Sequence, residues 1–305
     1  MAAPRHPNMA EIDVTIVLAV KNEERYIESA VQSILAQEGL RIEVIVVDDN
    51  SSDRTFALVQ PIAARDPRLR LLRNPRSGKN TAWNLGIAEA QGRFACLFCG
   101  DDIMPAGSLR ARFEKVRGFA DDRPVAGLCK ILTFSEDPRF SGTVVPRKPG
   151  RGALSGVSPL MNRPAVSRIF PVPEQFPNED TWMELAITYL PGWTVVHSDT
   201  IGCEWRVHDG NSINMMVGFP DYNRKISARI AAVPLFYERF GQELDEPSRA
   251  ALRARIACEQ ARLRGDLLGI LASRVSVVDK LRSLSIANAF LFGIRRRLYG
   301  LLSGW

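Results

Sequence analysis

Four alternations of strand-like and helix-like segments in the first 120 residues constrain the fold of this chain more than any other feature. Short apolar runs predict buried strands at residues 14–19, 43–48, 69–73 and 94–99. Apolar residues at helical spacing predict helices at residues 26–37, 53–64, 81–90 and 105–119. Ser51 and Ser52 are the expected N-caps of the second helix, and Pro105 is expected in the first turn of the fourth. The alternation predicts an α/β fold, in which a mostly parallel sheet has helices on both faces.

The pattern becomes looser after residue 123. We expect a strand at 125–134, a long loop rich in proline and glycine at 138–164, a helix at 181–190 and a strand at 193–197. The loop is either a lid that orders over a bound ligand or a surface excursion. From residue 221 the chain is predicted to be helical. We therefore expect three parts: a disordered N-terminus at 1–11, an α/β domain at 12–215 and a C-terminal helical extension at 216–305.

The composition limits the class of protein. The chain has 305 residues, of which 46% are apolar and 24% are charged, which is typical of a globular protein. Five cysteines without a paired framework favour a reducing compartment. Residues 1–11 lack the apolar core of a signal peptide, and no run of 18 apolar residues is present, so we expect no ordinary spanning helix.

Polar and acidic residues follow three of the four early strands. These segments are residues 19–23 (AVKNE), 48–53 (DDNSSD) and 99–102 (CGDD). Because parallel strands end at one edge of the sheet, where open α/β sheets bind their ligands, we expect these side chains to converge. Each segment alone could be only a polar turn or a helix cap. Together their carboxylates would repel one another, and a bound Mg²⁺ or Mn²⁺ ion that bridges a diphosphate would remove that cost.

Several other kinds of site are excluded by the residues present. No Gly-x-Gly-x-x-Gly follows the first strand, so the dinucleotide-binding fingerprint is absent. Gly78 and Lys79 are followed by Asn80, where a phosphate-binding loop needs Ser or Thr. Cys96 and Cys99 lie three residues apart on a predicted strand and should point to opposite faces, so we expect no joint chelation. Three histidines argue against a His-rich zinc site.

These segments together resemble the family 2 glycosyltransferases, which have the GT-A fold. The resemblance rests on residues 14–24 (VTIVLAVKNEE), 46–55 (VVDDNSSDRT), 78–86 (GKNTAWNLG) with Gly92 and Arg93, and 97–102 (LFCGDD). Residues 179–180 (ED) and 205–208 (WRVH) match later elements of the family. The resemblance covers about residues 12–210. It implies that residues 12–215 form a GT-A catalytic domain, with a Rossmann-like sheet and a nucleotide-sugar donor.

The resemblance implies a nucleoside pocket at the ends of the first two strands. Asp49, with Asp48 as its neighbour, would hydrogen-bond the nucleobase. A carboxylate that accepts the imide N–H of uracil is a natural pairing, so a UDP donor is favoured. Val20, Asn22 and Glu23 would line the same pocket.

The resemblance also implies a metal and diphosphate site that holds Mn²⁺ or Mg²⁺. The expected metal ligands are Asp101, Asp102 and His208. His208 could instead be a structural histidine near a turn. Arg206 is expected beside the donor phosphates, and Lys79 either approaches them or is a solvated loop residue.

A catalytic base is needed because the acceptor hydroxyl loses a proton as it attacks the anomeric carbon. Asp180 matches the base of the family, with Glu179 beside it. The alternative for both residues is an acidic helix start, which the helix dipole would favour. A single displacement with this base would invert the anomeric centre.

The C-terminal part is basic, since residues 223–305 carry 15 Lys and Arg against 7 Asp and Glu. Such a segment suits nucleic acid, an anionic membrane or a solvated face. It contains no recognisable nucleic-acid-reading motif, so we expect no nucleic-acid partner. Residues 283–302 combine an apolar helical stripe with three arginines at 295–297, which favours an in-plane membrane helix within 283–305. The alternative is a helix packed on the catalytic domain.

The sequence therefore predicts an inverting, metal-dependent glycosyltransferase. It would move a sugar from a nucleotide-diphosphate donor to a glycan or lipid-linked acceptor in surface polysaccharide synthesis. The expected location is cytoplasmic, on the inner face of a bacterial membrane. The alternative is a catalytically degenerate nucleotide-sugar-binding or scaffold protein, because Cys99 stands where the acidic motif of the family begins with Asp.

Overall fold

The computed structural model describes residues 12–119, 121–208 and 217–297. The chain forms two compact units, the first from Met1–Glu174 and Gly192–Arg206 and the second from Gln175–Pro191 and Val207–Trp305. The N-terminus that the sequence predicts to be disordered, residues 1–11, lies outside the described residues. The predicted domain boundary at 215 also falls outside them.

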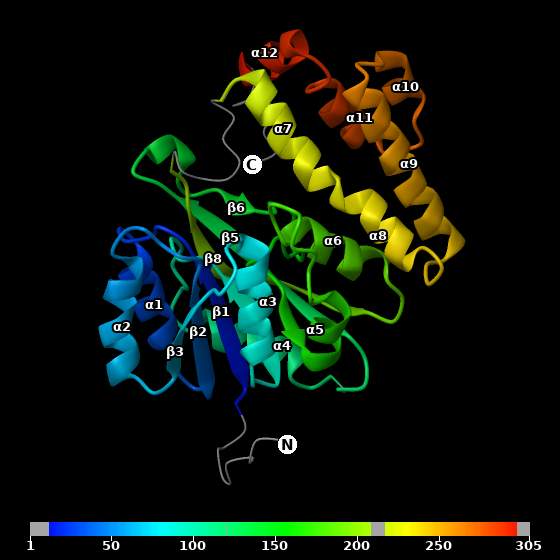
Figure 1. The fold of residues 1–305 in the computed structure, drawn as a ribbon. Coiled ribbons are helices and arrows are strands. Elements are labelled where there is room, and N and C mark those ends of the chain that lie inside the picture. Colours follow the sequence, from blue (N-terminus) through cyan, green and yellow to red (C-terminus); the bar gives the residue numbers. More distant parts are fainter. Residues whose placement is uncertain (1–11, 120, 209–216, 298–305) are drawn as a thin grey trace. The chain divides into compact units, whose positions relative to one another are not determined.

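The first unit is built on one sheet, which has eight strands among the residues that the structure describes (Figure 1). The strands are β1 (Val14–Val20), β2 (Ile42–Asp48), β3 (Leu69–Arg73), β4 (Phe94–Phe98), β5 (Val125–Phe134), β6 (Val144–Val145), β7 (Leu160–Asn162) and β8 (Thr194–Arg206). Their order across the sheet is β3-β2-β1-β4-β7-β5-β6, and β8 pairs with β5. β3, β2, β1 and β4 run parallel, and so do β5 and β8, whereas β7 is antiparallel to β4 and β5. The predicted α/β class and mostly parallel sheet are confirmed.

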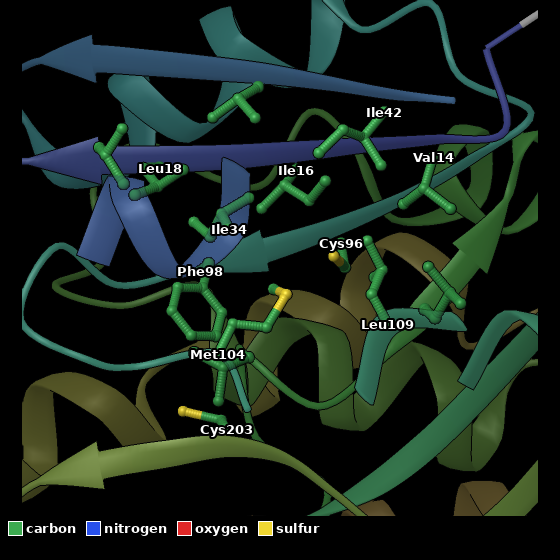
Figure 2. Close-up of a cluster of buried hydrophobic side chains, with 14 of the residues drawn as sticks. Val14, Ile16, Leu18, Ile34, Ile42, Cys96, Phe98, Met104, Leu109 and Cys203 are labelled. Atoms are coloured by element: carbon green, nitrogen blue, oxygen red, sulfur yellow. The ribbon is translucent and has the colours of Figure 1, made fainter. Parts of the chain in front are cut away.

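Helices cover both faces of this sheet (Figure 1). They are α1 (Ile27–Leu35), α2 (Thr55–Arg65), α3 (Lys79–Glu89), α4 (Ser108–Val116) and α5 (Arg163–Ile169). Alternate residues of a strand point to opposite faces. Ile16 therefore shares a core with Ile34 of α1 and Leu109 of α4 (Figure 2). Val46 belongs to the same core. Ile45 and Val47 pack with Ala82 of α3 on the other face. Apolar side chains on both faces explain the uninterrupted apolar runs in the sequence.

Gly86 allows α3 to pack closely on β1. A β-carbon at Gly86 would lie 2.3 Å from Cγ1 of Val17, a separation that real side chains do not reach. Only a glycine therefore fits at this point of the helix. The close packing holds α3 in place, and its first turn follows the loop that leaves β3.

Three local predictions for the first unit are wrong. Helix α4 begins at Ser108, after a left-handed Gly107, so Pro105 precedes the helix. The expected loop at 138–164 contains β6 and β7 because these short strands pair with β5. Strand β8 continues to Arg206, well beyond residue 197, because it pairs with β5 up to Phe134.

The second unit is helical. Its helices are α6 (Asp180–Tyr189), α7 (Phe219–Ile230), α8 (Ala232–Phe240), α9 (Glu246–Leu263), α10 (Leu267–Ala272), α11 (Val277–Leu284) and α12 (Ala289–Arg297). Trp182 of α6 is buried, with its ring 5.3 Å from that of Phe236 and nearly perpendicular to it. Within residues 12–297, leaving out those not described, no helix has both the length and the hydrophobicity needed to cross a bilayer.

The predicted helix at 283–302 is interrupted. The described part consists of the end of α11, a short turn and α12, while residues 298–302 lie outside the described residues. Phe292, within the predicted membrane segment, is buried, and its ring lies 4.8 Å from that of Tyr222. Ala287 of the predicted stripe is buried in a cluster with Cys258, and Leu284 and Leu291 pack against that cluster. Much of the predicted apolar stripe therefore packs within the second unit.

Candidate active site

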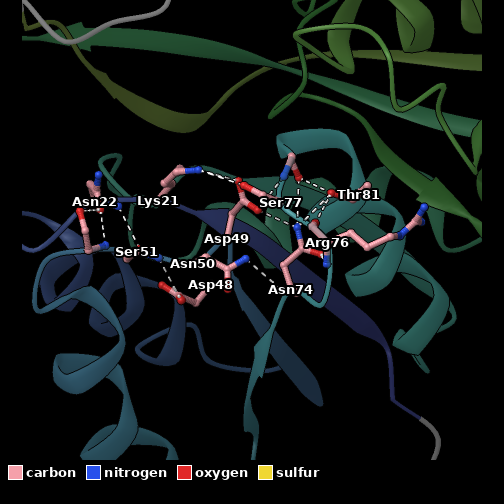
Figure 3. Close-up of polar contacts among 12 residues, drawn as sticks. Lys21, Asn22, Asp48, Asp49, Asn50, Ser51, Asn74, Arg76, Ser77 and Thr81 are labelled. Carbon is pink, nitrogen blue, oxygen red and sulfur yellow. Dashed lines mark hydrogen bonds and ion pairs between the residues drawn. The ribbon is translucent and has the colours of Figure 1, made fainter.

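The loops that follow β1 and β2 are bonded to each other at the carboxyl edge of the sheet (Figure 3). The amide of Asn22 donates to Oγ of Ser51 at 3.0 Å, and the amide of Ser52 donates to Oδ1 of Asn22 at 2.8 Å. Asn22 and Asn50 have φ angles of 58° and 56°, in the left-handed region that asparagine tolerates better than most residues. The polar residues of the two segments therefore hold two tight turns side by side.

Asp53 and Thr55 extend this linkage to the start of α2. The Asp53 carboxylate accepts hydrogen bonds from the amide of Thr55 at 2.9 Å and from the amide of Glu24 at 3.0 Å. Oγ1 of Thr55 accepts a bond from the amide of Glu23 at 2.7 Å. The prediction that Ser51 and Ser52 cap α2 is wrong, because both residues form hydrogen bonds with Asn22 in the loop after β1 instead.

Asp49 joins the end of β2 to the loop before α3 (Figure 3). Its Oδ1 accepts hydrogen bonds from the amide of Gly78 at 2.8 Å and from Nδ2 of Asn74 at 2.7 Å, and its Oδ2 lies 3.4 Å from Nζ of Lys21. The amide of Asp49 donates to the carbonyl of Val20 at 2.8 Å. The Val20 side chain is buried in the core, so this predicted pocket residue contributes through its backbone.

Asp48 faces the interior and is fully buried. Its Oδ2 accepts a hydrogen bond from the amide of Ser51 at 3.3 Å and lies 3.7 Å from Nη1 of Arg73. The guanidinium of Arg73 stacks on the ring of Phe56, 3.9 Å from its centre. Asp48 therefore stabilises the turn, which leaves Asp49 as the better candidate of the pair for binding a nucleobase.

A group of possible metal ligands follows β4. One ligand atom each from Cys99, Asp101 and Asp102 lies within 4.8 Å of the others. The group offers two hard carboxylate oxygens and one soft thiol sulfur, and such donors can hold a divalent cation. Cys96 is buried in the core and is not a member of this group.

Several carboxyl groups lie close together around this group. Burial, together with the charge of Asp101, raises the pKa of Asp102 to about 7. Burial also raises the pKa of Glu23 to about 8, and the charges of Asp101, Asp102 and Asp53 add to that effect. Oδ2 of Asp102 accepts a hydrogen bond from the thiol of Cys203 at 3.4 Å. A cation at this edge would relieve the repulsion between these carboxylates.

Arg206, at the end of β8, is fixed beside the acidic group. Its amide donates to Oδ1 of Asp102 at 2.9 Å, and its Nε donates to the carbonyl of Asp101 at 2.8 Å. Its guanidinium carbon lies 4.3 Å from the ring centre of Tyr26 and 4.4 Å from that of Phe134. A guanidinium held between two aromatic rings keeps one orientation. The sequence motif contains Arg206 but gives no sign of either ring, although Phe134 ends a predicted strand and stands opposite Arg206 in the sheet.

The predicted base lies in the second unit. Asp180 begins α6, and its Oδ2 lies 2.5 Å from Nη2 of Arg229, while Nδ2 of Asn178 donates to its Oδ1. Glu179 is buried, whereas the side chain of Asp180 is partly accessible. Arg229 and Asn178 were not identified from the sequence, because an arginine on a surface helix and an asparagine in a loop give no local signal.

Two further residues remain predictions. Lys79 is exposed as the first residue of α3, next to Gly78. His208 is half-buried and belongs to the second unit, whereas Asp101 and Asp102 belong to the first. Its predicted role as a metal ligand is therefore untested.

Most of these residues lie in one segment of the chain, and this segment matches a known family. Residues 15–138 match the family described as "Glycosyl transferase family 2". This segment belongs to glycosyl transferase family 2. It runs from β1 to just beyond β5 and contains Asn22, Asp49 and Asp101. The family that the sequence motifs suggested is confirmed.

The chain is also similar to a curated bacterial protein. It is 44% identical over 104 residues to the succinoglycan biosynthesis protein ExoO of Rhizobium meliloti (strain 1021), over 34% of this chain and 29% of ExoO. The chain therefore spans about a third of the length of curated relatives such as ExoO.

Two solved structures share the fold of this chain. TarS 1–349 of S. aureus, in complex with UDP-GlcNAc, has a TM-score of 0.57 and 17% identity, over 95% of this chain and 87% of that one. The mannosyltransferase PcManGT of Pyrobaculum calidifontis, in complex with GDP-Man and Mn²⁺, has a TM-score of 0.56 and 18% identity, over 97% and 78%. At such identities the likeness shows the fold, which is the GT-A fold that the resemblance implied.

Proposed function

We propose that this chain is an inverting, metal-dependent glycosyltransferase that transfers a sugar from a UDP-linked donor to a glycan or lipid-linked acceptor. One observation carries the proposal: Cys99, Asp101 and Asp102 bring possible metal ligands together after β4, on a segment that belongs to family 2. The bonded loops after β1 and β2 lie at the same carboxyl edge of the parallel strands. This is the edge at which open α/β sheets bind their ligands.

The Asp49 loop is the proposed nucleoside site. Oδ1 of Asp49 accepts two short hydrogen bonds from the protein, whereas the contact of Oδ2 with Lys21 is longer at 3.4 Å. A carboxylate oxygen has capacity for more than one donor, so Oδ2 can accept the imide N–H of uracil. TarS was solved with UDP-GlcNAc and PcManGT with GDP-Man, so this fold accommodates either base. The assignment of uracil therefore rests on Asp49.

The residues after β4 fit a divalent ion, because they offer carboxylate and thiol donors. Asp101 and Cys99 are the proposed ligands, and Asp102, whose two oxygens accept donors from Arg206 and Cys203, supports them. Mn²⁺ or Mg²⁺ held there would neutralise charge on the diphosphate leaving group. PcManGT was solved with Mn²⁺. The guanidinium of Arg206 would add fixed positive charge beside the same phosphates.

Asp180 is the proposed general base. The acceptor oxygen forms a bond to the anomeric carbon, the bond from that carbon to the diphosphate breaks, and the acceptor proton moves to Asp180. Asn178 and Arg229 hold the Asp180 carboxylate in one orientation, which favours proton transfer along a fixed path. A single displacement of this kind inverts the configuration of the sugar.

We further propose a role in surface polysaccharide synthesis. The similar protein ExoO is named for succinoglycan biosynthesis. A donor made in the cytoplasm and an acceptor carried by a lipid would meet at the inner face of a bacterial membrane. The second candidate function is a nucleotide-sugar-binding or scaffold protein without turnover, and Cys99 in the acidic motif favours it.

A thermal-shift panel tests the proposal. UDP, GDP, CDP, TDP and UDP-sugars are each added with and without Mn²⁺, because a ligand that binds only the folded state raises Tm. We expect UDP compounds to raise Tm, Mn²⁺ to increase the rise, and Asp101→Ala to remove the effect of the metal. Asp122→Ala, an exposed aspartate away from the edge, is the matched control. No shift with any nucleotide would contradict the proposal. Donor binding without sugar transfer would favour the scaffold function.

A further inference from the structure

The second unit exposes apolar side chains in a narrow part of the chain. Among the described residues, twelve large apolar side chains are strongly exposed, and nine of these lie between residues 263 and 294. Six of the nine form what we call the α10–α11 face: Leu267, Leu268, Leu271, Val277, Val278 and Leu281. This concentration is unusual for a water-facing surface, where exposed apolar residues are normally scattered.

The spacing of these residues places them on one side of each helix. In α10 they lie at positions i, i+1 and i+4 from Leu267, and in α11 at the same positions from Val277. The exposed fraction reaches 78% at Leu268 and 72% at Val277, and α11 buries none of its residues. A folded domain normally covers the apolar side of an amphipathic helix. We therefore expect an apolar partner to cover the α10–α11 face.

The opposite side of these helices is anchored in the protein. Ile270 of α10 is buried in a cluster with Cys258 and Ala261 of α9, and Leu284 of α11 packs against that cluster. α10 and α11 also contact each other and α9. The α10–α11 face consequently points away from the helical core that supports it.

Basic side chains flank the face. Arg264, Arg274 and Arg282 are exposed next to it in sequence, and Arg296 and Arg297 are exposed at the end of α12. The same region carries two acidic residues, Asp266 and Asp279, and Oδ1 of Asp279 lies 3.5 Å from Nη1 of Arg282. The Asp266 side chain accepts the amide of Gly269 at 2.8 Å, and the Asp279 side chain accepts the hydroxyl of Ser276 at 2.6 Å. These five arginines outnumber the two carboxylates, so the charge around the face is mainly positive.

The apolar side chains of the α10–α11 face and the flanking arginines together favour one kind of partner. An apolar helix face bordered by arginines is complementary to a bilayer, which is apolar inside and carries anionic headgroups at its surface. A second copy of this chain would bring arginines against arginines. A nucleic acid would pair with the arginines but would leave the leucines and valines without apolar contact.

We propose that the α10–α11 face binds an anionic membrane surface, with its six apolar side chains at the acyl boundary and the flanking arginines at lipid phosphates. The proposal moves the membrane contact from the predicted segment 283–305 to the helices before it, because Phe292 and Ala287 of that segment are buried. It does not depend on the proposed transferase activity.

Vesicle sedimentation of the full chain tests this binding. The vesicles contain either phosphatidylcholine alone or phosphatidylcholine with phosphatidylglycerol. We expect the protein to sediment with the anionic vesicles and to stay in solution with the neutral ones. The double variant Leu268→Glu/Leu281→Glu should bind at least tenfold more weakly, since two exposed apolar anchors are replaced by charges that anionic lipid repels. Each of Arg264→Gln and Arg274→Gln should weaken binding about fivefold.

Leu154→Glu is the matched control, because Leu154 is 45% exposed and lies in the first unit. It should bind like the unchanged protein. Circular dichroism checks that each variant is folded, and Val277→Gln/Val278→Gln replaces the double variant if that one fails to fold. Equal binding by the face variants and the control would overturn the proposal, as would no binding of the unchanged protein. A dimer that the face variants dissociate, without vesicle binding, would overturn it in favour of self-association.

Discussion

Oδ2 of Asp180 and Nη2 of Arg229 lie 2.5 Å apart in the second unit, which ties the first residue of α6 to the last turn of α7. The two residues are far apart in sequence, and Asn178 holds the other carboxylate oxygen. A carboxylate fixed from both sides loses little orientational freedom when it receives a proton, which suits a general base.

Asp180→Asn should therefore lower kcat by about 10²–10⁴-fold, because the amide cannot accept the acceptor proton. The rise in Tm that the donor causes should remain, since the proposed donor residues are others. Glu184→Gln is the control: it lies on the same helix, is paired with Arg255 and should stay fully active. Single-turnover assays on purified variants measure the change. Full activity of Asp180→Asn would exclude this residue as the base.

The thiol of Cys99 should shift the metal preference of the site from Mn²⁺ toward Cd²⁺. Replacing the thiol by a carboxylate in Cys99→Asp gives oxygen donors throughout, which Mn²⁺ prefers to sulfur. The Kd for Mn²⁺ should fall by roughly tenfold and the Kd for Cd²⁺ should rise, a change of the size found at other perturbed metal sites. Titration calorimetry measures both constants, and Cd²⁺ should give a thiolate charge-transfer band only with Cys99 present. Cys258→Ser, in the second unit, serves as the control. Equal Cd²⁺ binding by Cys99→Asp and the unchanged chain would show that sulfur is not a ligand.

The sheet and its polar edge were predictable because both are local features of the sequence. A buried strand such as β2 needs an apolar residue at nearly every position, and the acidic residues follow directly where β2 and β4 end. The contacts that give Asp49 and Arg206 their positions were not predictable. Asn74 reaches Asp49 from the loop after β3. Tyr26, the residue before α1, and Phe134 of β5 reach Arg206, so each contact depends on how distant segments pack.

The C-terminal segment contains a helix cap that the helical spacing of its apolar residues does not reveal. Apolar residues from 284 to 301 keep a helical spacing, which predicts one long helix. The structure ends α11 at Leu284 and begins α12 at Ala289. Oδ1 of Asn288 accepts the amide of Leu291 at 3.0 Å, as a capping residue does at a helix start. This cap favours a new helix start at Ala289 over one continuous helix, because the Asn288 side chain pairs with an amide that has no partner within the helix.

Because the pKa of Glu23 is raised, we expect the stability of the folded state to fall as the pH rises. Burial, with the nearby charges of Asp101 and Asp102, raises the pKa of Glu23 from 4.5 to about 8. The folded state therefore holds this proton more tightly than the unfolded state, so the associated stability is complete below the unfolded pKa and is lost as the pH rises through the folded one. Glu23→Gln cannot ionise and should flatten the fall in Tm between about pH 5 and 8 in a buffer with chelator. Glu28→Gln, on an exposed position of α1, should keep the original slope. An unchanged slope in Glu23→Gln would contradict the raised pKa.

Asp49→Asn separates the two roles of Asp49, which are to anchor the loop before α3 and to bind the nucleobase. The uncharged amide weakens the hydrogen bonds with Gly78 and Asn74, so the free energy of unfolding should fall by about 1.5–3 kcal/mol in urea denaturation. Calorimetry should show UDP binding weakened by at least about tenfold, since a carboxylate pairs with the imide more strongly than an amide oxygen does. Asp66→Asn is the control, because Asp66 accepts bonds from Arg68 at the amino end of β3 and should affect stability alone. Lost stability with unchanged UDP affinity in Asp49→Asn would restrict Asp49 to the loop.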